Sequence, residues 1–211
     1  MAINGFRRMG FYSRFVLPRF IDGVCGIADT EKQRRKIIPA AEGVVLEVGI
    51  GSGLNLPIYC AARVTKVIGV DPDGHLWKRA ADRREAVPFR VDRIGVSGEE
   101  IPLDSKSADT VVVTYSLCTI PDPVKALTEM RRILKPGGRL LFAEHGESPD
   151  ENVRKWQRRI DPVWKRIAGG CHAGRPILSY FDRAGWTLDR VDQGYIPGPK
   201  TISYEYWGAA R

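Results

Sequence analysis

A glycine-rich turn that follows a short apolar run is the strongest chemical signal in this sequence. The run Val44–Val48 has the β-branched composition of a buried strand and carries one acid, Glu47. Three glycines in alternate positions come next: Gly49, Gly51 and Gly53. Glycines allow a tight turn and let a ligand approach the backbone without meeting a Cβ atom. The turn therefore predicts a small-ligand site at the carboxyl end of a strand, where doubly wound sheets bind their ligands.

A carboxylate at the end of the next apolar run fits the same ligand site. Asp71 follows the run Val64–Val70 and stands 20 residues after Gly51. A carboxylate at this position can accept hydrogen bonds from the hydroxyls of a ribose. The dinucleotide fingerprint requires a glycine where this chain has Leu54, so the expected ligand is not a dinucleotide.

Alternating strands and helices are expected to position these residues. The first part of the chain predicts five strands and three helices, with strands at 44–49, 64–70, 89–96, 110–115 and 139–144, and helices at 54–62, 75–85 and 123–134. This order predicts right-handed crossovers and a parallel sheet covered on both faces. The last part predicts helices at 151–168 and 177–184 and strands at 186–195 and 202–209. We therefore expect an α/β fold with a mostly parallel seven-stranded sheet and a C-terminal antiparallel hairpin.

Length and composition fit one globular domain. The chain has 211 residues, of which 43% are hydrophobic and 27% charged. These values argue against disordered, collagen-like and coiled-coil sequences. No apolar run approaches the roughly 18–20 residues that a membrane-spanning helix needs. Arg14, Arg19 and Asp22 interrupt the N-terminal segment, so no secretory signal is expected.

The cysteines follow no pattern of a disulfide or metal site. They are widely spaced, without a C-x-x-C pair, at Cys25, Cys60, Cys118 and Cys171. We therefore expect no disulfide framework, no bound metal and a cytoplasmic location. Cys118 and Cys171 are expected to pack as small buried hydrophobes.

Glu47, the glycine turn and Asp71 together resemble the S-adenosyl-L-methionine (SAM) site of class I methyltransferases, which have a Rossmann-like fold. In that superfamily the segment matching Ser97–Pro102 lies beside the adenine, and the segment matching Tyr115–Cys118 passes under the methionine part of SAM. The resemblance implies SAM as the cofactor and S-adenosyl-L-homocysteine as its product. It also implies a set of cofactor-binding residues, which are Glu47, Gly49, Gly51, Gly53, Asn55, Asp71, Pro72, Gly98, Glu99, Tyr115 and Leu117.

Short elements in the second half of the chain carry a narrower resemblance. They are Leu117-Cys118, Arg131–Gly138, Glu144-His145, Asp161-Pro162-Val163-Trp164 and Gly170-Cys171. These elements resemble the methyltransferase-like alkyl thiol S-methyltransferases, which are membrane-associated enzymes of animals with bacterial relatives. The resemblance implies methyl transfer from SAM to a small-molecule thiol.

Methylation of a thiol requires a base and a site that binds the acceptor. A thiol must lose its proton before it attacks, and His145 follows the fifth strand at the same sheet edge as the glycine turn. His145 is therefore the candidate base, with His172 in reserve, and Glu144 is a candidate to orient His145 or to line the floor of the pocket. Tyr12, Asp161 and Trp164 are candidates for the acceptor site. An N-cap role for Asp161, in a helix starting at Pro162, and core packing for Trp164 stay open.

The positive charge is concentrated in two segments. The chain carries a formal charge of +8, with a net +4 in residues 1–43 and +5 in residues 151–175. We expect residues 1–43 to form a helical arm or lid and residues 44–211 to form the methyltransferase domain. Residues 151–185 are expected to be a basic helical insertion over the active site. The charge can reflect solvated helix faces or attraction to an acidic surface.

Two other functions stay open beside S-methylation. One is N- or C-methylation of a phospholipid amine or quinone precursor, with peripheral contact to an anionic membrane. The other is methylation of nucleic acid, which the charge suggests. Amino-methylating nucleic-acid enzymes often carry an Asn/Asp-Pro-Pro-aromatic run after strand four, where this chain has Tyr115–Cys118. The sequence therefore favours a small-molecule acceptor over nucleic acid, and it makes no prediction of oligomeric state.

Overall fold

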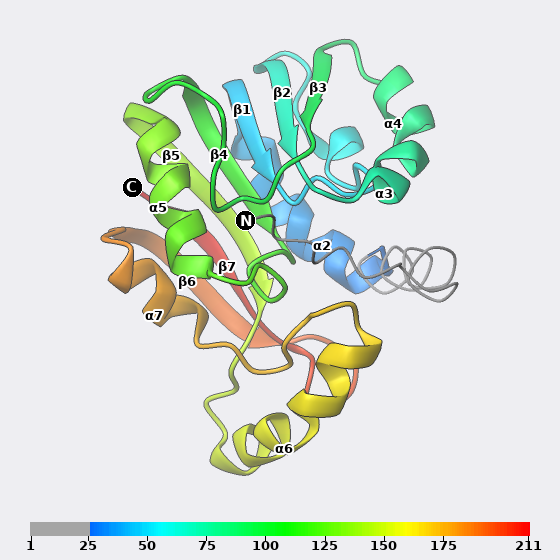
Figure 1. Ribbon diagram of the computed structural model, residues 1–211, viewed down its shortest axis with the longest axis vertical. Coiled ribbons are helices and arrows are strands. Elements are labelled where there is room, and N and C mark those ends of the chain that lie inside the picture. Colours follow the sequence, from blue (N-terminus) through cyan, green and yellow to red (C-terminus); the bar gives the residue numbers. More distant parts are fainter. Residues whose placement is uncertain (1–25) are drawn as a thin grey trace, which may run out of the picture.

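The structure is a computed structural model that describes residues 26–211. Its centre is a seven-stranded sheet in the order β3-β2-β1-β4-β5-β7-β6 (Figure 1). Strand β7 runs antiparallel to β5 and to β6, and the other neighbouring pairs are parallel. The predicted sheet and its C-terminal hairpin are thereby confirmed. The strands are β1 (Gly43–Val48), β2 (Val64–Val70), β3 (Arg90–Ile94), β4 (Ala108–Thr114), β5 (Leu134–His145), β6 (Leu188–Tyr195) and β7 (Tyr204–Ala210).

One face of the sheet is covered by the N-terminal helix and by the segments between β1 and β3. Helix α2 (Ala28–Ile37) packs its buried end against this face, in a cluster that includes Val45. The helix expected over 75–85 forms as two shorter helices, α3 (Gly74–Arg79) and α4 (Ala81–Glu85). These segments therefore border the carboxyl ends of β1 and β2, where the ligand site was expected.

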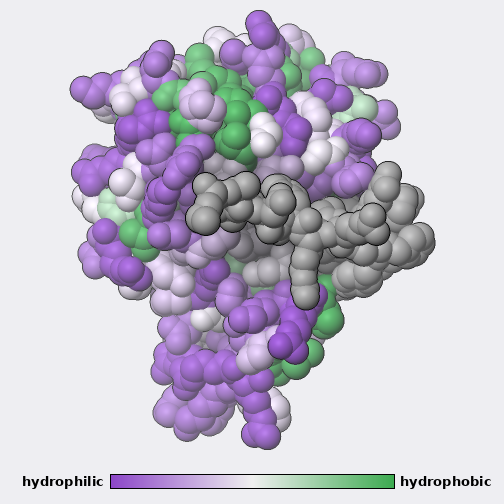
Figure 2. Space-filling view, viewed as in Figure 1, coloured by the Kyte–Doolittle hydropathy of each residue, from purple (hydrophilic) through white to green (hydrophobic). Residues whose placement is uncertain are grey.

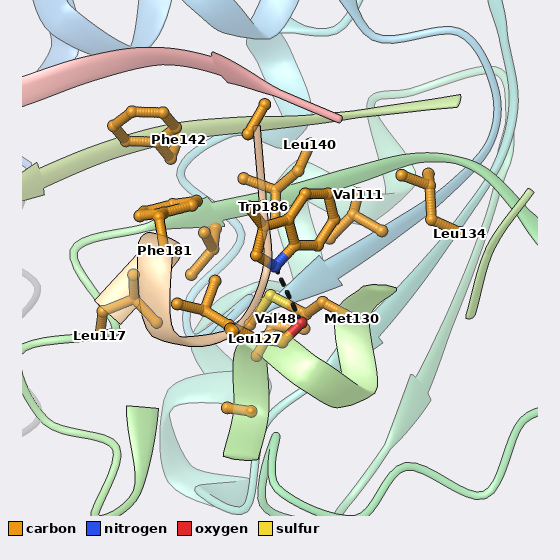
Figure 3. Packing of buried hydrophobic residues seen from close by; sticks show 14 of the residues in the cluster. Val48, Val111, Leu117, Leu127, Met130, Leu134, Leu140, Phe142, Phe181 and Trp186 are labelled. Atoms are coloured by element: carbon orange, nitrogen blue, oxygen red, sulfur yellow. Dashed lines mark hydrogen bonds between the residues drawn. The ribbon is translucent and has the colours of Figure 1, made fainter. Parts of the chain in front are cut away.

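The other face is covered by α5 (Pro123–Ile133) and α7 (Ile177–Arg183). Their apolar sides meet the sheet in a cluster around Phe142, which is fully buried (Figure 3). The indole nitrogen of Trp186 donates a hydrogen bond of 3.1 Å to the carbonyl of Leu127, which links the start of the hairpin to α5. A buried indole N–H needs such a partner, so this bond satisfies the one polar atom of the ring.

The helix expected over 54–62 does not form. The structure has only a short 3₁₀ turn there, η3 (Leu56–Ile58). Pro57 has no N–H to donate within a helix, and the side chain of Asn55 is buried in hydrogen bonds to other parts of the chain. The segment after the glycine turn therefore follows the wall of the ligand site and does not form an amphipathic helix.

Helix α6 (Glu151–Ile167) extends beyond the carboxyl edge of the sheet (Figure 1). The sequence predicted a helix over 151–168 with an interruption at Pro162, whereas α6 continues through this proline. Its N-cap is Asp150, whose carboxylate accepts hydrogen bonds from N–H groups of the first turn. Because α6 does not begin at Pro162, the N-cap role considered for Asp161 is wrong.

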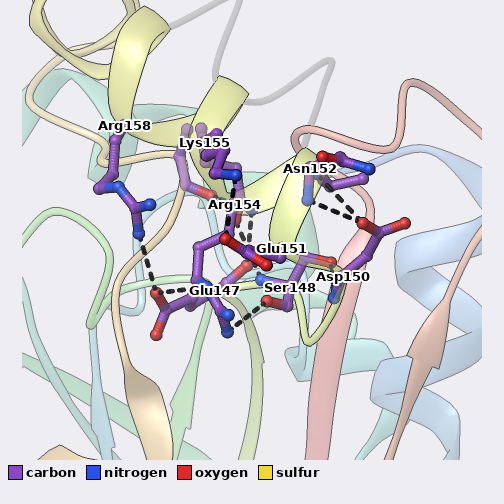
Figure 4. A network of polar contacts seen from close by, with 12 residues as sticks. Glu147, Ser148, Asp150, Glu151, Asn152, Arg154, Lys155 and Arg158 are labelled. Atoms are coloured by element: carbon purple, nitrogen blue, oxygen red, sulfur yellow. Dashed lines mark hydrogen bonds and ion pairs between the residues drawn. The ribbon is translucent and has the colours of Figure 1, made fainter.

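Ion pairs tie the first turns of α6 to the segment that follows β5 (Figure 4). The carboxylate of Glu147 lies 3.6 Å from Arg154 Nε and 3.9 Å from Arg158 Nη1. The protrusion that α6 forms is mostly hydrophilic in Figure 2. Three large apolar side chains of α6 are nevertheless exposed by 55%, 62% and 48%, and they are Trp156, Val163 and Ile167.

The described residues include only part of the segment that was predicted to form an N-terminal arm or lid. Residues 1–25 lie outside the described residues, and Tyr12 with them. The described part of the predicted arm packs on the sheet through α2 and through Ile38, which is fully buried. A lid formed by residues 1–43 therefore stays a prediction. Within residues 26–211, no helix has the length and apolar character needed to cross a membrane.

Candidate active site

A cavity of about 330 Å³ lies at the carboxyl ends of β1, β2 and β4, where the SAM site was expected. Seven of the predicted cofactor-binding residues line it, namely Glu47, Gly49, Gly51, Asp71, Pro72, Gly98 and Tyr115. The other four, Gly53, Asn55, Glu99 and Leu117, do not line it. We call this space the cofactor cavity.

The glycine turn brings the backbone close to two different neighbours. Gly49 has φ +79°, and a Cβ added there would stand 1.8 Å from Ser116 Oγ, which lies in the loop after β4. Gly51 has φ +50°, and a Cβ there would meet no heavy atom nearer than 3.8 Å. Gly49 is therefore required for the approach of two loops. Gly51 leaves open the space that a ligand would occupy.

The carboxylate of Glu47 is buried at the bottom of the cofactor cavity. Asn55 Nδ2 donates to Oε1 at 2.9 Å, and the hydroxyl of Tyr59 donates to Oε2 at 2.7 Å. Burial raises the pKa of Glu47 to about 7, although both hydrogen bonds and the charge of Arg34 oppose this shift. Asn55 therefore acts on the cavity by positioning Glu47.

Arg34 is a cavity residue that sequence reasoning missed. It comes from α2, is 5% exposed and lines the cofactor cavity. Its Nη1 donates to Asn55 Oδ1 at 2.9 Å and also to Thr114 Oγ1. Its Nε is buried and has no hydrogen-bond partner among residues 26–211. A guanidinium that lines a cavity suits the carboxylate of an amino-acid ligand. In the sequence, Arg34 is one of several basic residues of α2, and nothing distinguished it from them.

Asp71 is held by the loops around it. Its Oδ2 accepts the N–H of Gly51 at 2.9 Å, and its Oδ1 accepts the N–H of Asp73 at 2.7 Å. Burial raises the pKa of this carboxyl above its usual value, and the two backbone hydrogen bonds oppose the rise. Each oxygen keeps a second lone pair, so the carboxylate can still accept from two ribose hydroxyls.

The predicted residues outside the cofactor cavity support its walls. A Cβ at Gly53 would stand 2.7 Å from Leu56 Cδ1, so this glycine permits the turn into η3. Glu99 accepts the N–H of Asp122 at 2.8 Å and ties two loops together. Leu117 is fully buried within the core cluster.

A second cavity, of about 230 Å³, adjoins the first, since Tyr115 and Thr119 line both. Its lining is mainly apolar and includes Trp164 of α6, which was a predicted acceptor-site residue. Two of its polar groups, His145 and Glu205, are paired neighbours on β5 and β7, and we call this part of the cavity its polar end. We call this space the acceptor cavity. Its other lining residues are Ile27, Thr30, Cys118, Ala168, Cys171, Ile196, Pro197, Gly198, Pro199, Ile202 and Ser203.

Two cysteines lie beside His145 in the acceptor cavity. His145 Nε2 is 3.2 Å from Cys171 Sγ, and the donor atoms of Cys118, His145 and Cys171 all lie within 4.8 Å of one another. The contact with Cys171 and the nearby imidazole hold the pKa of Cys118 well below its usual value. Burial alone would lower the pKa of His145, but the negative charge of Cys118 raises it to about 9. The cysteines are thus not merely small packed hydrophobes, as the sequence had suggested.

The other two acidic candidates stabilise loops. Glu144 is fully buried, and its Oε1 accepts the N–H groups of Ser116 and Leu117 at 2.7 and 3.0 Å. It does not orient the ring of His145, whose Nδ1 has no hydrogen-bond partner in the described part of the chain. Asp161 accepts from His172 Nδ1 at 2.7 Å and so closes the loop after α6. Neither Glu144 nor Asp161 lines the acceptor cavity.

The chain is similar in sequence to known methyltransferases. A family model for a methyltransferase domain matches residues 46–142, from within β1 to within β5. Thiol S-methyltransferase TMT1B of Homo sapiens is 34% identical over 178 residues, which are 77% of this chain and 71% of that protein. The protein of the same name from Rattus norvegicus is 37% identical over 150 residues, 68% of this chain, but this chain spans only 59% of its length.

Other relatives carry different printed activities. A phosphatidylethanolamine N-methyltransferase of Cereibacter sphaeroides is 32% identical over 138 residues, which are 64% of this chain and 66% of that protein. A solved SAM-dependent methyltransferase of Thermotoga maritima superposes with a TM-score of 0.65 at 18% identity and covers 94% of this chain and 96% of its own. This structural likeness shows the fold alone.

Proposed function

Since the chain belongs to the methyltransferase family that includes thiol S-methyltransferase TMT1B, we propose that it transfers the methyl group of SAM to a small-molecule thiol. The observation that carries this proposal is the acceptor cavity. It is mainly apolar, it adjoins the cofactor cavity at Tyr115, and its polar end holds His145 beside two cysteines. An apolar thiol would place its sulfur at that end.

The proposed reaction needs alignment and loss of one proton. The thiol sulfur attacks the methyl carbon of the sulfonium in line, and much of the rate comes from holding both partners in this arrangement. An alkyl thiol has a pKa of about 8.5 or above, so most of it carries its proton at neutral pH. We propose that His145 assists the loss of this proton: with a pKa of about 9 the free imidazole is cationic at neutral pH, and its charge stabilises the thiolate.

A substrate panel tests the proposal directly. The full chain would be incubated with SAM and with matched thiols, amines, phenols and lipids, and the mass of each methylated product would be measured. We expect apolar thiols to be methylated and their amine and alcohol counterparts to remain unmodified. Methylation of amines or phenols in preference to thiols would contradict the proposal.

A lipid amine or quinone precursor is the second candidate acceptor. The exposed apolar side chains of α6 stand among basic residues of the same helix, as in helices that lie on anionic membranes. A relative named as a phosphatidylethanolamine N-methyltransferase also supports this alternative. Salt-sensitive sedimentation with anionic vesicles, together with methylation of the vesicle lipid, would favour it.

Arg34 provides a test of how SAM is oriented. If its guanidinium binds the carboxylate of SAM, Arg34→Met removes a charge-assisted hydrogen bond worth about 1.5–3 kcal/mol, so SAM affinity falls by about 10–150-fold. Methylthioadenosine has no amino-acid part, and its affinity is expected to stay nearly constant. Calorimetry with both ligands measures the difference. Arg35→Met is a matched control, since Arg35 pairs with Glu31 on the exposed side of α2. An equal loss for both ligands would indicate a structural role for Arg34.

Glu47 is expected to make SAM affinity depend on pH. With a pKa of about 7, part of this carboxyl is protonated in the free protein at lower pH. The ammonium group of SAM favours the carboxylate, so binding below about pH 7 releases a proton, and affinity rises with pH up to that value, by at most about tenfold per unit. Arg34, Tyr59 and Asp71 are the other charged or titratable groups near it. Calorimetry is expected to show this slope in Asp71→Asn and not in Glu47→Gln. The reverse result would assign the proton to Asp71.

A further inference from the structure

Three side chains with soft donor atoms meet at the polar end of the acceptor cavity. Cys118 comes from the loop after β4, His145 from the end of β5 and Cys171 from the loop after α6. Two sulfurs and one imidazole form a ligand set that suits zinc. Catalytic zinc sites typically have three protein ligands and keep a fourth position open.

The spacing of the donor atoms is close to that of a tetrahedral ion. Zn–S bonds of about 2.3 Å and Zn–N bonds of about 2.0–2.1 Å place the donor atoms about 3.5–3.8 Å apart. His145 Nε2 lies 3.2 Å from Cys171 Sγ, and the whole set of donor atoms lies within 4.8 Å. Small rotations of the three side chains would therefore bring the donors to zinc distances.

The residues around the cluster also suit a cation. Metals bind the thiolate form of cysteine, and both sulfurs lie beside the imidazole of His145. Glu144 precedes His145 in β5, and Glu205 is the residue paired with His145 on β7. Acidic side chains in a partly buried cluster are costly unless a positive charge or a proton compensates them.

We propose that Cys118, His145 and Cys171 bind a zinc ion whose fourth position opens into the acceptor cavity and takes the acceptor thiol as a thiolate. This inference rests on the proposed S-methylation and states how His145 assists the loss of the proton, namely as a metal ligand. All three ligands line the acceptor cavity, so the fourth position faces the space where an apolar thiol would lie. A thiolate sulfur is a good zinc ligand, so the fourth position suits a thiol acceptor.

The proposed step balances in atoms and charge. The S–H bond of the acceptor breaks, the proton passes to solvent, and the sulfur binds zinc as a thiolate. A lone pair of that sulfur forms the new S–CH₃ bond while the bond between the methyl carbon and the SAM sulfur breaks. The sulfonium becomes the neutral thioether of S-adenosyl-L-homocysteine. The methylated product is also a thioether, a weaker zinc ligand than a thiolate, and it leaves.

Metal binding is the first test and does not depend on activity. The full chain, reduced with a phosphine because thiol reductants would compete, is dialysed against zinc, and bound metal is measured by elemental analysis. We expect one zinc ion per chain in the wild type and in the control Cys60→Ser, whose cysteine lies outside both cavities. Zinc affinity is expected to fall by at least about tenfold in Cys118→Ser and in Cys171→Ser. Cobalt in place of zinc is expected to show thiolate charge-transfer absorption that both variants weaken. No bound zinc in the wild type, or equal binding in all variants, would overturn the proposal.

Chelation separates this inference from the proposed function. The protein is stripped with a chelator, its fold is checked by circular dichroism and SAM binding, and thiol methylation is measured before and after zinc is returned. We expect turnover to fall at least about tenfold and to recover with zinc. Full turnover in the stripped protein would overturn the role of zinc and leave S-methylation standing. Stoichiometric zinc without methylation of any thiol would instead refute the proposed function and the part of the inference that depends on it.

Discussion

Replacing His145 by alanine is expected to lower the turnover of an alkyl thiol by about 10²–10⁴-fold, the range that a group assisting proton removal contributes. His145 Nε2 lies at the polar end of the acceptor cavity, 3.2 Å from Cys171 Sγ. Its loss removes this assistance, whether the imidazole acts directly or through a bound ion. SAM affinity is expected to change little, because His145 does not line the cofactor cavity. Steady-state rates and calorimetry on the same preparation measure the two effects.

Comparing acidic with ordinary thiols shows whether His145 acts on the proton of the acceptor or on its position. An aromatic thiol that is already ionised at neutral pH needs no help to lose its proton, so its loss of turnover in His145→Ala is expected to be much smaller. His172→Ala is a suitable control, since His172 pairs with Asp161 and does not line the acceptor cavity. Equal losses for acidic and ordinary thiols would mean that His145 positions the acceptor. Unchanged turnover of both would remove His145 from the mechanism.

The sheet and much of the cofactor cavity could be predicted because their signals are local. The strand run, the glycine turn and Asp71 lie within 28 residues, from Val44 to Asp71, and each has a backbone or charge requirement visible in its residue type. The structure brings these residues together at one edge of the sheet, as their order along the chain implied. The prediction of a helix over 54–62 was wrong, because it did not take account of Pro57 or of the buried hydrogen bonds that Asn55 makes.

The acceptor cavity could not be predicted to the same extent, because it is assembled from distant segments. Cys118, His145 and Cys171 are separated by more than 25 residues from one another, so no spacing rule for metal ligands or catalytic pairs detects them. Arg34 was missed for a similar reason. Its neighbours Asn55 and Thr114 lie 21 and 80 residues away, and only the fold reveals that this arginine is buried.

Gly49→Ala is expected to reduce SAM affinity by at least about 100-fold, or about 2.7 kcal/mol. The left-handed backbone at φ +79° costs a residue with a Cβ about 1–2 kcal/mol. The new methyl group would also stand 1.8 Å from Ser116 Oγ and 2.6 Å from its Cβ, so the glycine turn and the loop after β4 would have to separate. Both segments line the cofactor cavity, and their separation would widen it. Calorimetry with SAM measures the loss.

A second substitution separates the clash from the backbone strain. In the double variant Gly49→Ala with Ser116→Gly, the colliding Oγ and Cβ atoms are gone while the strained φ remains. SAM affinity is therefore expected to recover in part. Gly194→Ala in β6 is the control, because a Cβ there would meet no heavy atom within 4 Å. If the double variant binds SAM no better than Gly49→Ala, the close approach of the two loops is not what shapes the site, and the requirement for glycine lies in the backbone conformation alone.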